Sequence, residues 1–422
     1  MVFAIFILFT ASYFLHLTSR IPALGLIRFD FILIFVVLGL AILSGSFSRY
    51  QKNLQPTRLL LYLLLFILVT IPFVEWPGSV INYGIVNFSK VAIFFFFITI
   101  IIDTEKRLKI FVTVFLLCQT FRILEPVFLH ITTGYWGDIA YSTINAEQQS
   151  LNRLSGAPHD VVNANQFAWV INSTLPFIYY LLWQSVKTLK ILAILLFPIF
   201  VYALLLTGSR SGLLSLLLIV IIIMLLGKNK SKKIIIGTVI FIPMILFIAG
   251  NLSPELGERY LSIIDRDVAG GASAAGRVTA LSKNFSTVSN KPFIGHGLGT
   301  SQEISANFGG GGRAMLTHDL YVEVLQELGL AGFIIFALYI KAVIISLLRA
   351  RRILMDLSSE HSWLLNLVTA TLVWLGMHLF YSLSCFGLSS WEWYLFGGIA
   401  TVCLKLAQEY ASNEDAVQLQ QL

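Results

Sequence analysis

Charged residues are scarce in this chain: of its 422 residues, 12% are charged and 57% are hydrophobic. A soluble globular protein has about 25% charged residues, so the composition excludes an ordinary soluble domain. Apolar runs such as VAIFFFFITIII and LLLIVIIIMLLG are frequent, and they lack the apolar–polar alternation of a transmembrane barrel. Because about 20 apolar residues cross the hydrocarbon core of a bilayer, the sequence predicts an all-α polytopic integral membrane protein.

Cysteine is also rare, and its three positions (Cys118, Cys385 and Cys403) lie in or beside apolar segments. They form neither a metal-site spacing nor a disulfide framework. The chain has no H-E-x-x-H motif and no G-x-x-x-x-G-K-[ST] loop. Asp265 and Asp267, in the sequence DRD, resemble the acidic metal clamp of nucleotide-sugar transferases. No soluble nucleotide-binding domain accompanies them, so a solvated loop is the better interpretation, and we predict no metal and no cofactor.

Twelve apolar segments are candidate membrane spans. They are residues 2–18, 29–45, 57–74, 82–102, 108–124, 164–184, 191–206, 212–227, 234–250, 328–348, 363–381 and 388–407. This pattern predicts three parts of the chain. Residues 1–250 hold spans one to nine, residues 251–327 form an outer loop with short helices, and residues 328–422 hold the last three spans and a cytoplasmic tail.

Lysine and arginine predict the orientation of these spans, because short cytoplasmic loops are rich in both residues. All five even-numbered loops are basic, whereas the short loops EWPGSVINYG and SLSCFG contain neither residue. Both termini are therefore predicted to be cytoplasmic, with the long segments 125–163 and 251–318 facing outward. The formal net charge of +7 mostly reflects these cytoplasmic loops and is not evidence for a nucleic-acid partner.

The stretch LLLTGSRSGLLSLLL puts Arg210 between two apolar runs, 20 residues after Lys190 and 18 before Lys228. At about 1.5 Å per residue, Arg210 is expected about one hydrocarbon thickness (roughly 30 Å) away from both lysines, at the outer interface. There it either reaches lipid headgroups or binds an anionic ligand.

Two further basic residues favour an anionic ligand. Lys90 and Arg122 are expected in the outer halves of their spans, about 24 Å from Lys106 and about 22 Å from Arg107 respectively. Ionisable groups at that depth usually face the bundle interior or a wet cavity, although Arg122 has a possible partner in Glu125. The guanidinium fork of arginine is suited to phosphate.

The two outer segments hold further candidates. The block RLSGAPHDVVNANQFAW is polar just before a span, which fits either a sugar site or a solvated loop; its polar residues are Arg153, His159, Asp160, Asn163 and Asn165. The turn-forming sequence NKPFIGHGLG precedes a predicted amphipathic helix.

That helix is predicted to begin with Thr317 as its N-cap. Its apolar face holds Leu320, Val324 and Leu328, and a more polar face holds the glutamates; these are Glu323 and Glu327. His318 lies at the start of the helix, either as a polar capping residue or as a group that exchanges a proton near neutral pH.

In the order and spacing of these motifs the chain resembles the O-antigen ligase and polymerase superfamily. The motifs that carry the resemblance are RLSG with NANQFA, TGSRSG, the GR at Arg277, PFIGHGLG, and HDLYVEVLQELGLAGF. Twelve spans with a large loop between the ninth and tenth also match the ligase architecture. The specific motifs lie within residues 153–333.

The resemblance implies a metal-independent, inverting membrane glycosyltransferase of the bacterial inner membrane. Such an enzyme moves a glycan from undecaprenyl pyrophosphate to an acceptor on the periplasmic face, here the lipid A–core or a growing glycan. Arg210 and Arg277 are then expected to bind the pyrophosphate, and His318 to activate the acceptor hydroxyl. The remaining substrate contacts are expected from Lys90, Arg122, Arg153, Asn165 and Asp319.

Asp319 stands where an asparagine is common in the family, so it either orients His318 or raises its pKa. An O-antigen ligase is the first expectation, and an O-antigen or exopolysaccharide polymerase is the alternative. A protein O-oligosaccharyltransferase and a secondary transporter are less favoured. Transporters place ionisable groups near the midplane of the membrane in symmetric repeats, whereas the charges of this chain are expected at the outer face.

Overall fold

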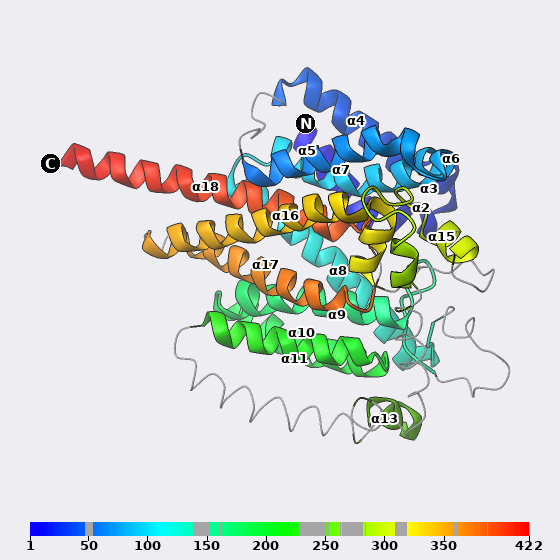
Figure 1. Cartoon of the computed structure of the whole chain (residues 1–422). Helices are drawn as coiled ribbons and strands as arrows, with labels where there is room; N and C mark the ends of the chain where they lie inside the picture. The colour runs from blue at the N-terminus through cyan, green and yellow to red at the C-terminus, as the bar shows by residue number, and fades with distance from the viewer. Residues whose placement is uncertain are drawn as a thin grey trace. The chain divides into compact units, whose positions relative to one another are not determined.

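The computed structural model describes residues 1–46, 54–137, 152–160, 162–227, 250, 253–261, 263, 282, 284–308, 319–357, 361–385 and 387–421. Within these ranges the regular structure is entirely helical, as predicted, and contains no strand (Figure 1). The chain divides into two compact units, each assembled from three separate stretches of sequence.

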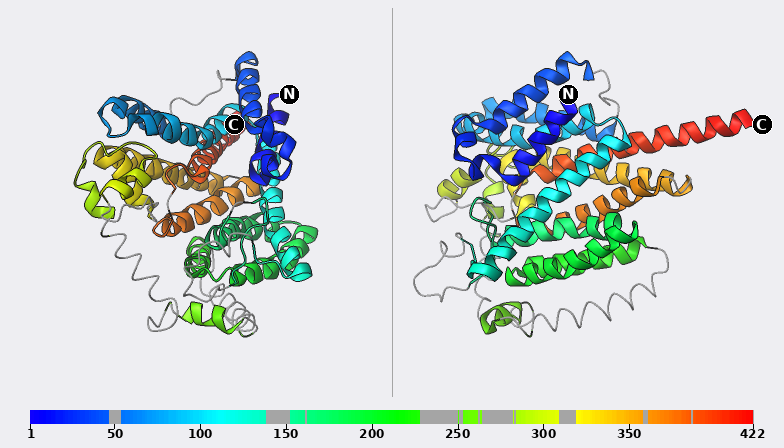
Figure 2. Two further views of the ribbon diagram at one scale, coloured as in Figure 1. Left: turned by 90° about the vertical axis from the view of Figure 1, so that its right-hand side faces the viewer. Right: turned by 180° about the vertical axis from the view of Figure 1, so that it is seen from behind.

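Unit 1 consists of Met1–Gly45, Lys106–Ala272 and Thr369–Tyr381. Its helices are α1 (Val2–Leu15), α2 (Leu17–Arg20), α3 (Pro22–Leu26), α4 (Phe29–Leu43), α8 (Glu105–Thr133), α9 (Ala164–Phe177), the π-helix η5 (Ile178–Trp183), α10 (Lys187–Leu206), α11 (Arg210–Leu226), α13 (Pro254–Leu261) and the last turns of α17 (Ser362–Tyr381). Helices α10 and α11 form a hairpin and lie side by side in every view (Figures 1 and 2).

The core of unit 1 is built around a fully buried tryptophan of α17, Trp374. Its ring centroid lies 5.7 Å from that of Phe115 and 5.5 Å from that of Phe177. Trp169 of α9 lies 6.5 Å away and donates its indole N–H to His378 at 3.0 Å. Each aromatic pair of this kind contributes about 0.5–1.5 kcal/mol of stability in addition to the burial of its apolar surface. Because the rings come from α8, α9 and α17, these contacts hold the three helices together.

Unit 2 consists of Ser46–Glu105, Ser273–Val368 and Ser382–Leu422. Its helices are α5 (Gln55–Thr70), the 3₁₀ turn η2 (Ile71–Phe73), α6 (Pro77–Ser79), the π-helix η3 (Val80–Gly84), α7 (Ile85–Ile101), α15 (Ser301–Phe308), α16 (Leu320–Asp356), the first turns of α17 and α18 (Trp391–Gln421). Helix α16 packs against α18 and α5, and α18 also packs against α7. The final polar stretch continues α18 as a helix to Gln421.

Glycine permits the closest helix contact in unit 2. A Cβ on Gly397 of α18 would lie 2.1 Å from the Tyr339 hydroxyl and 2.9 Å from the Phe95 ring. The Tyr339 hydroxyl instead donates to the Trp393 carbonyl at 3.0 Å. Small residues at such positions let membrane helices approach closely, so Gly397 is needed for α18 to pack against α16 and α7.

Six helical segments in the described part of the chain are long and apolar enough to cross a membrane. They are Gln55–Phe73, Pro77–Ile101, Glu105–Thr133, Lys187–Leu206, Leu320–Asp356 and Ser362–Tyr381. Helices α1, α4 and α11 are apolar but shorter. The predicted spans overlap described helices except for 234–250, of which residues 234–249 lie outside the described part.

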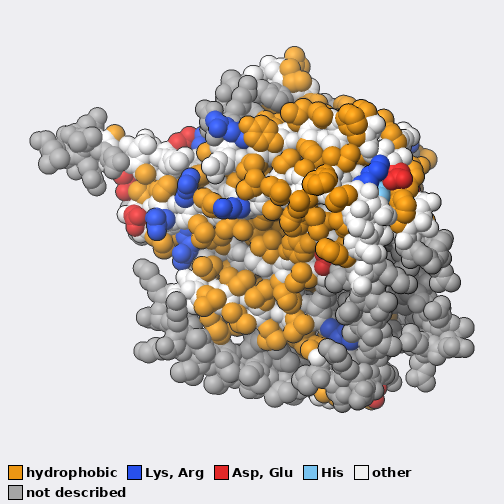
Figure 3. Space-filling model, viewed as in Figure 1, with side chains coloured by type: hydrophobic (Ala, Val, Ile, Leu, Met, Phe, Trp, Pro, Cys, Tyr) orange, Lys and Arg blue, Asp and Glu red, His pale blue; other side chains and the backbone are white. Residues whose placement is uncertain are grey.

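Hydrophobic side chains also cover much of the described surface on the visible face (Figure 3). On α5, Leu65 and Val69 are both 58% exposed, and on α8 Leu117 and Phe128 are both 64% exposed. A soluble monomer rarely exposes a large continuous apolar area. Lipid contact accounts for these faces, as expected for a membrane protein.

Candidate active site

The turn between α10 and α11, which we call the Arg210 turn (residues 207–210), follows directly from its sequence. Gly208 has φ +57°, a left-handed conformation that glycine adopts without strain. The Thr207 hydroxyl donates to the Leu204 carbonyl at 2.6 Å and accepts from the Ser209 N–H at 3.1 Å. Ser209 is the N-cap of α11, and its hydroxyl accepts from the Gly212 N–H at 3.2 Å. Arg210 is therefore the first residue of a 17-residue helix.

Two other arginines contact consecutive carbonyls of this turn. Arg153 Nε donates to the Thr207 carbonyl and Arg259 Nε donates to the Gly208 carbonyl, both at 2.7 Å. A second guanidinium nitrogen of Arg153 donates to Asn165 Oδ1 at 2.6 Å. The turn thus brings together Arg153 and Asn165, which the sequence had grouped, and adds Arg259, which sequence reasoning had not selected.

A tyrosine beside Arg259 contacts the end of α10. The Tyr260 hydroxyl lies 3.0 Å from the Leu205 carbonyl and 3.3 Å from the Leu204 carbonyl. Burial raises the pKa of Tyr260 well above its ordinary value near 10. A hydrogen bond with Thr207 and the positive charges of Arg153 and Arg259 lower the pKa, but by less than burial raises it. The hydroxyl therefore stays protonated and remains a donor at neutral pH.

The electrostatics of the Arg210 turn suit an anion. The positive end of the α11 dipole lies here, and backbone N–H groups at a helix N-terminus are ready-made donors to phosphate oxygens. Arg153 and Arg259 add positive charge beside Gly208, and Arg210 follows two residues later. Guanidinium groups bind phosphate through paired, charge-assisted hydrogen bonds.

The polar residues of the block before α9 make separate sets of contacts within the protein. Asn163 is the N-cap of α9: its side chain accepts from the Asn165 and Gln166 N–H groups at 3.0 Å, and Gln166 reciprocates as in a capping box. Asp160 is instead buried and takes part in an ion pair. The block therefore divides into a helix cap, an ion-pair partner and the Arg153–Asn165 pair.

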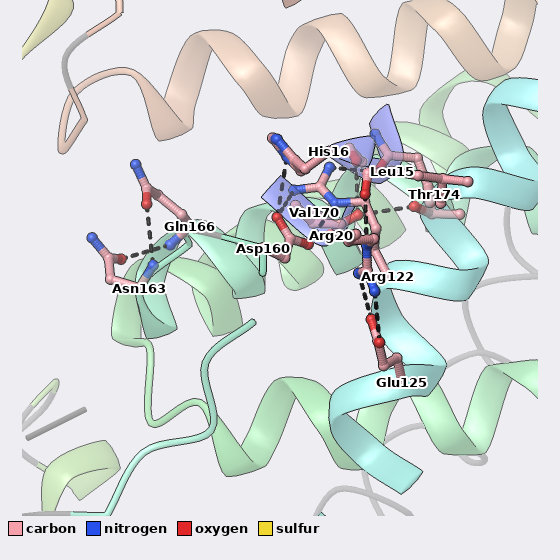
Figure 4. A network of polar contacts seen from close by, with 12 residues as sticks. Leu15, His16, Arg20, Arg122, Glu125, Asp160, Asn163, Gln166, Val170 and Thr174 are labelled. Atoms are coloured by element: carbon pink, nitrogen blue, oxygen red, sulfur yellow. Dashed lines mark hydrogen bonds and ion pairs between the residues drawn. The ribbon is translucent and has the colours of Figure 1, made fainter. Parts of the chain in front are cut away.

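Arg122 pairs with Asp160 rather than with Glu125, the partner that sequence proximity had offered. Its Nε and one terminal nitrogen donate to the two Asp160 oxygens at 2.6 and 2.8 Å, and the other donates to Gln119 at 2.8 Å. His16 Nε2 lies 3.2 Å from the same carboxylate. Figure 4 shows these side chains converging on Asp160, with Glu125 paired to Arg20 nearby.

The Asp160 carboxylate is ionised throughout the neutral pH range. Burial by itself raises its pKa, but hydrogen bonds from His16 and Arg122 and the charge of Arg122 outweigh this and lower the pKa to about 2. The pKa of an unfolded aspartate is about 3.9. The resulting stabilisation is complete above about pH 4 and is lost as the pH falls towards 2.

Replacing Asp160 by asparagine is expected to lower the free energy of unfolding by about 3–5 kcal/mol, because the Arg122 charge would stay buried without a counter-charge. The midpoint of thermal unfolding in detergent measures the loss. Glu125→Gln is the matched control, and its loss should be smaller because Glu125 and Arg20 are 23% and 14% exposed. Equal losses in the two variants would contradict a special role for the Asp160 pair.

The other predicted contacts lie in unit 2. Lys90 of α7 donates to Asn87 Oδ1 at 3.4 Å. Asp319, and not Thr317, is the N-cap of α16: its carboxylate accepts from the Val322 N–H at 3.0 Å. The predicted cap was two residues too early because Asp319 supplies the acceptor where the helix begins. Burial raises the pKa of Asp319, although the backbone hydrogen bonds oppose this.

The two glutamates expected on a polar face of this helix are in fact buried. Glu323 accepts from the Gly387 and Leu388 N–H groups at 2.6 and 3.3 Å. Glu327 accepts from the Gly299 N–H at 2.8 Å and from Ser301 through its N–H and its hydroxyl. Backbone donors from two loops replace water around both carboxylates, so the more polar face of the helix is buried as well. The apolar face of Leu320, Val324 and Leu328 is buried as predicted.

Residues 295–297 (GHG) fit into a break in α16. The break lies at Gly329, where φ is +63° and ψ is −171°. His296 and Gly297 donate to the Gln326 and Glu327 carbonyls, each at 2.9 Å. In return, the N–H groups of residues 330 and 331 donate to the carbonyls of residues 292 and 293 at 2.7 and 3.1 Å. The predicted turn sequence thus satisfies the backbone groups that the helix break would otherwise leave unpaired.

Residues 191–337 match the family model described as O-antigen ligase. The matched segment contains most of α10, the Arg210 turn, α11, α13, α15 and the first half of α16. No curated protein matches the chain significantly. The family match supports glycosyl transfer of the ligase or polymerase type and, with the apolar helices, indicates a multi-pass membrane protein.

The matched segment includes Arg210 and Arg259, whereas Lys90, Arg122 and Arg153 precede it. Arg277 and His318 fall within its matched range but outside the described residues, as do Asp265 and Asp267. In the described ranges no cluster of three or more His, Cys, Asp or Glu side chains could hold a metal ion. Sequence reasoning missed Arg259 and Tyr260 of α13. An arginine followed by a tyrosine is too common a pair to have identified them as part of a site.

Proposed function

We propose that this protein is a membrane glycosyltransferase that moves a glycan from undecaprenyl pyrophosphate to an acceptor on the periplasmic face of the bacterial inner membrane. We further propose that it is an O-antigen ligase whose acceptor is the lipid A–core. The observation that carries the proposal is the arginine-rich Arg210 turn within a domain that matches the O-antigen ligase family. A pyrophosphate ester is the type of anion that such a turn suits.

The proposed reaction breaks the bond between the anomeric carbon of the glycan and a pyrophosphate oxygen. Negative charge grows on the pyrophosphate as this bond lengthens, and Arg210 and Arg277 stabilise that charge. Fixed charges are most effective in a poorly solvated site, where they need no reorganisation during the reaction. The leaving group departs as undecaprenyl pyrophosphate.

His318 is the proposed general base. It takes the proton from the acceptor hydroxyl, whose oxygen forms the new glycosidic bond. His318 directly precedes Asp319, the N-cap of α16. The positive end of the helix dipole disfavours a protonated imidazole at such a position, which keeps the base neutral. Attack on the face opposite the leaving group inverts the anomeric configuration.

Secondary contacts complete the proposal. Lys90, Arg153 and Asn165 are proposed to contact the donor or the acceptor, in addition to their contacts within the protein. Arg122 and Asp319 keep the same proposed role, although their side chains already bind Asp160 and the Val322 N–H respectively.

The topology that goes with this function is twelve spans with both termini cytoplasmic. The proposed parts are residues 1–250 with nine spans, the periplasmic loop region 251–327, and residues 328–422 with three spans and the tail. Cysteine-accessibility labelling of positions in the loops that follow α4 and α7, before and after membrane permeabilisation, tests the orientation.

Deletion of the gene tests the proposed acceptor through the gel pattern of surface polysaccharide. Loss of a ligase leaves bare lipid A–core while lipid-linked polymer accumulates. Loss of a polymerase instead leaves the core carrying a single repeat unit, an outcome that would replace the ligase assignment by the polymerase alternative. An unchanged pattern would contradict both.

Transfer by the purified protein is expected to continue in excess chelator. Arginine side chains supply the positive charge in the proposed mechanism, so no divalent ion has to neutralise the pyrophosphate. The measurement is the transfer rate with and without chelator, and again after addition of Mg²⁺ or Mn²⁺. If the rate collapses in chelator and recovers with either ion, Asp265 and Asp267 become the candidate ligands.

A further inference from the structure

We propose that α13 is a positioning element for Arg210: Arg259 and Tyr260 hold the end of α10 and the Arg210 turn in the conformation that aims Arg210 at its ligand. We call this pair of side chains the α13 clamp. The catalytic part of the inference rests on the proposed function, whereas the structural part does not depend on it. Arg259 and Tyr260 are positioning residues here, with no contact to the reacting atoms required.

The carbonyls at the end of α10 receive donors both from within the turn and from α13. The Leu204 carbonyl accepts from the Thr207 N–H and hydroxyl, and the Leu205 carbonyl accepts from the Gly208 N–H. The last four carbonyls of a helix have no partner within the helix, and a buried carbonyl without a partner is destabilising by about 1–3 kcal/mol. The Leu204 and Leu205 carbonyls also accept from the Tyr260 hydroxyl, and the Gly208 carbonyl accepts from Arg259 Nε. Two adjacent residues of α13 thus serve three carbonyls of the hairpin.

A second segment holds the same turn from another part of the sequence. The Leu206 carbonyl accepts from the Leu154 N–H at 2.9 Å, and the Thr207 carbonyl accepts from Arg153 Nε at 2.7 Å. The clamp and this segment therefore each add donors to the carbonyls of residues 204–208, beside those from within the turn. Each segment contributes donors from outside the hairpin.

Gly208 shows how closely the clamp is fitted. A Cβ at this position would lie 2.9 Å from Leu256 of α13, 3.2 Å from Arg259 Cδ and 3.4 Å from Arg153 Nε. The absence of a side chain lets both arginines reach the turn from either side. Leu256 is itself buried, so α13 is seated by apolar contact as well as by the two donors.

The α13 clamp affects the rate of the proposed reaction because it holds a residue that is very close to Arg210 in the sequence. Only Ser209 separates the clamped Gly208 from Arg210. A shift of about 1 Å in a group that stabilises the transition state can slow a reaction about 10²-fold. Contacts at Gly208 therefore control where the Arg210 guanidinium lies without touching the substrate.

Amide hydrogen exchange of the full-length protein in detergent, without substrate, tests the structural part. Arg259→Gln and Tyr260→Phe should each speed exchange in residues 204–213 by about tenfold, the effect of losing roughly one hydrogen bond. Glu258→Gln is the matched control, because Glu258 is the exposed neighbour on the same helix. Tyr260→Phe removes a single oxygen, so it keeps the test open if Arg259→Gln does not fold.

Turnover in the same preparations tests the catalytic part. Both clamp variants should lower kcat for transfer from the polyprenyl-pyrophosphate donor, by up to about 10²-fold for Arg259→Gln, with the donor KM nearly unchanged. Unchanged exchange in both variants would overturn the clamp, and unchanged exchange with a raised donor KM in Arg259→Gln would make Arg259 a substrate contact. If the wild-type protein transfers nothing, the proposed function fails, and the exchange data still decide whether α13 holds the turn.

Discussion

Replacing Arg210 by alanine is expected to abolish glycan transfer while the protein still reaches the membrane. Arg210 begins α11, where the helix dipole and the neighbouring guanidinium groups favour an anion. Removing one fixed donor to a developing negative charge typically slows a reaction about 10²–10³-fold. Surface polysaccharide on a gel, compared with the amount of protein in the membrane, measures the loss.

Two further variants separate the geometry of Arg210 from its charge. Arg210→Lys should restore little activity, because a point charge cannot reproduce the two-oxygen grip of a guanidinium. Arg28→Ala removes an exposed arginine from the same unit and should leave transfer near the wild-type level. Near-normal polysaccharide in Arg210→Ala would remove Arg210 from the site.

Replacing His318 by alanine is expected to slow transfer about 10²–10⁴-fold, the usual contribution of a positioned general base. Binding of the lipid-linked donor should change little, because the arginines and not His318 are proposed to hold the pyrophosphate. Donor affinity and turnover measured in one preparation distinguish these two steps. His318→Gln should be no more active, since an amide does not accept a proton at neutral pH.

The possible results for His318 lead to different conclusions. If donor affinity falls together with turnover, His318 is a phosphate contact rather than a base. If turnover survives in both variants, His318 has no chemical role and is merely a polar residue before the helix. A pH–rate profile adds an independent check, because removing the base should remove the acidic limb of the profile.

Local patterns in the sequence predicted where most of the described apolar helices lie, although not every helix end: the N-cap of α16 is Asp319 and not Thr317. The sequence TGSRSG contains the glycine and the N-cap serine that the Arg210 turn uses. The glycines of NKPFIGHGLG provide left-handed residues for the loop that fits the break in α16. Spacing alone predicted the buried face of α16, because side chains three or four residues apart share one side of a helix.

Contacts between distant residues were harder to predict. Arg122 has Glu125 three residues away, yet it pairs with Asp160, which is 38 residues away. Glu323 and Glu327 were predicted to share a more polar face of the helix, but the sequence does not indicate the backbone donors from two loops that hold them in buried positions. The partner of a buried charged side chain depends on which segments the fold brings next to it. Residues far apart in the sequence can be such partners, so the sequence alone does not identify them.

The sequence by itself determined the all-helical membrane class, the apolar segments, the Arg210 turn and the resemblance to the O-antigen ligase family. All of these depend on residue type and on spacings of a few residues, which local physics controls. Only the tertiary structure decided that Arg153 and Arg259 bind consecutive carbonyls of that turn, with Tyr260 beside them. Every residue carries a carbonyl, so the choice of these acceptors depends on which distant segments the fold brings together.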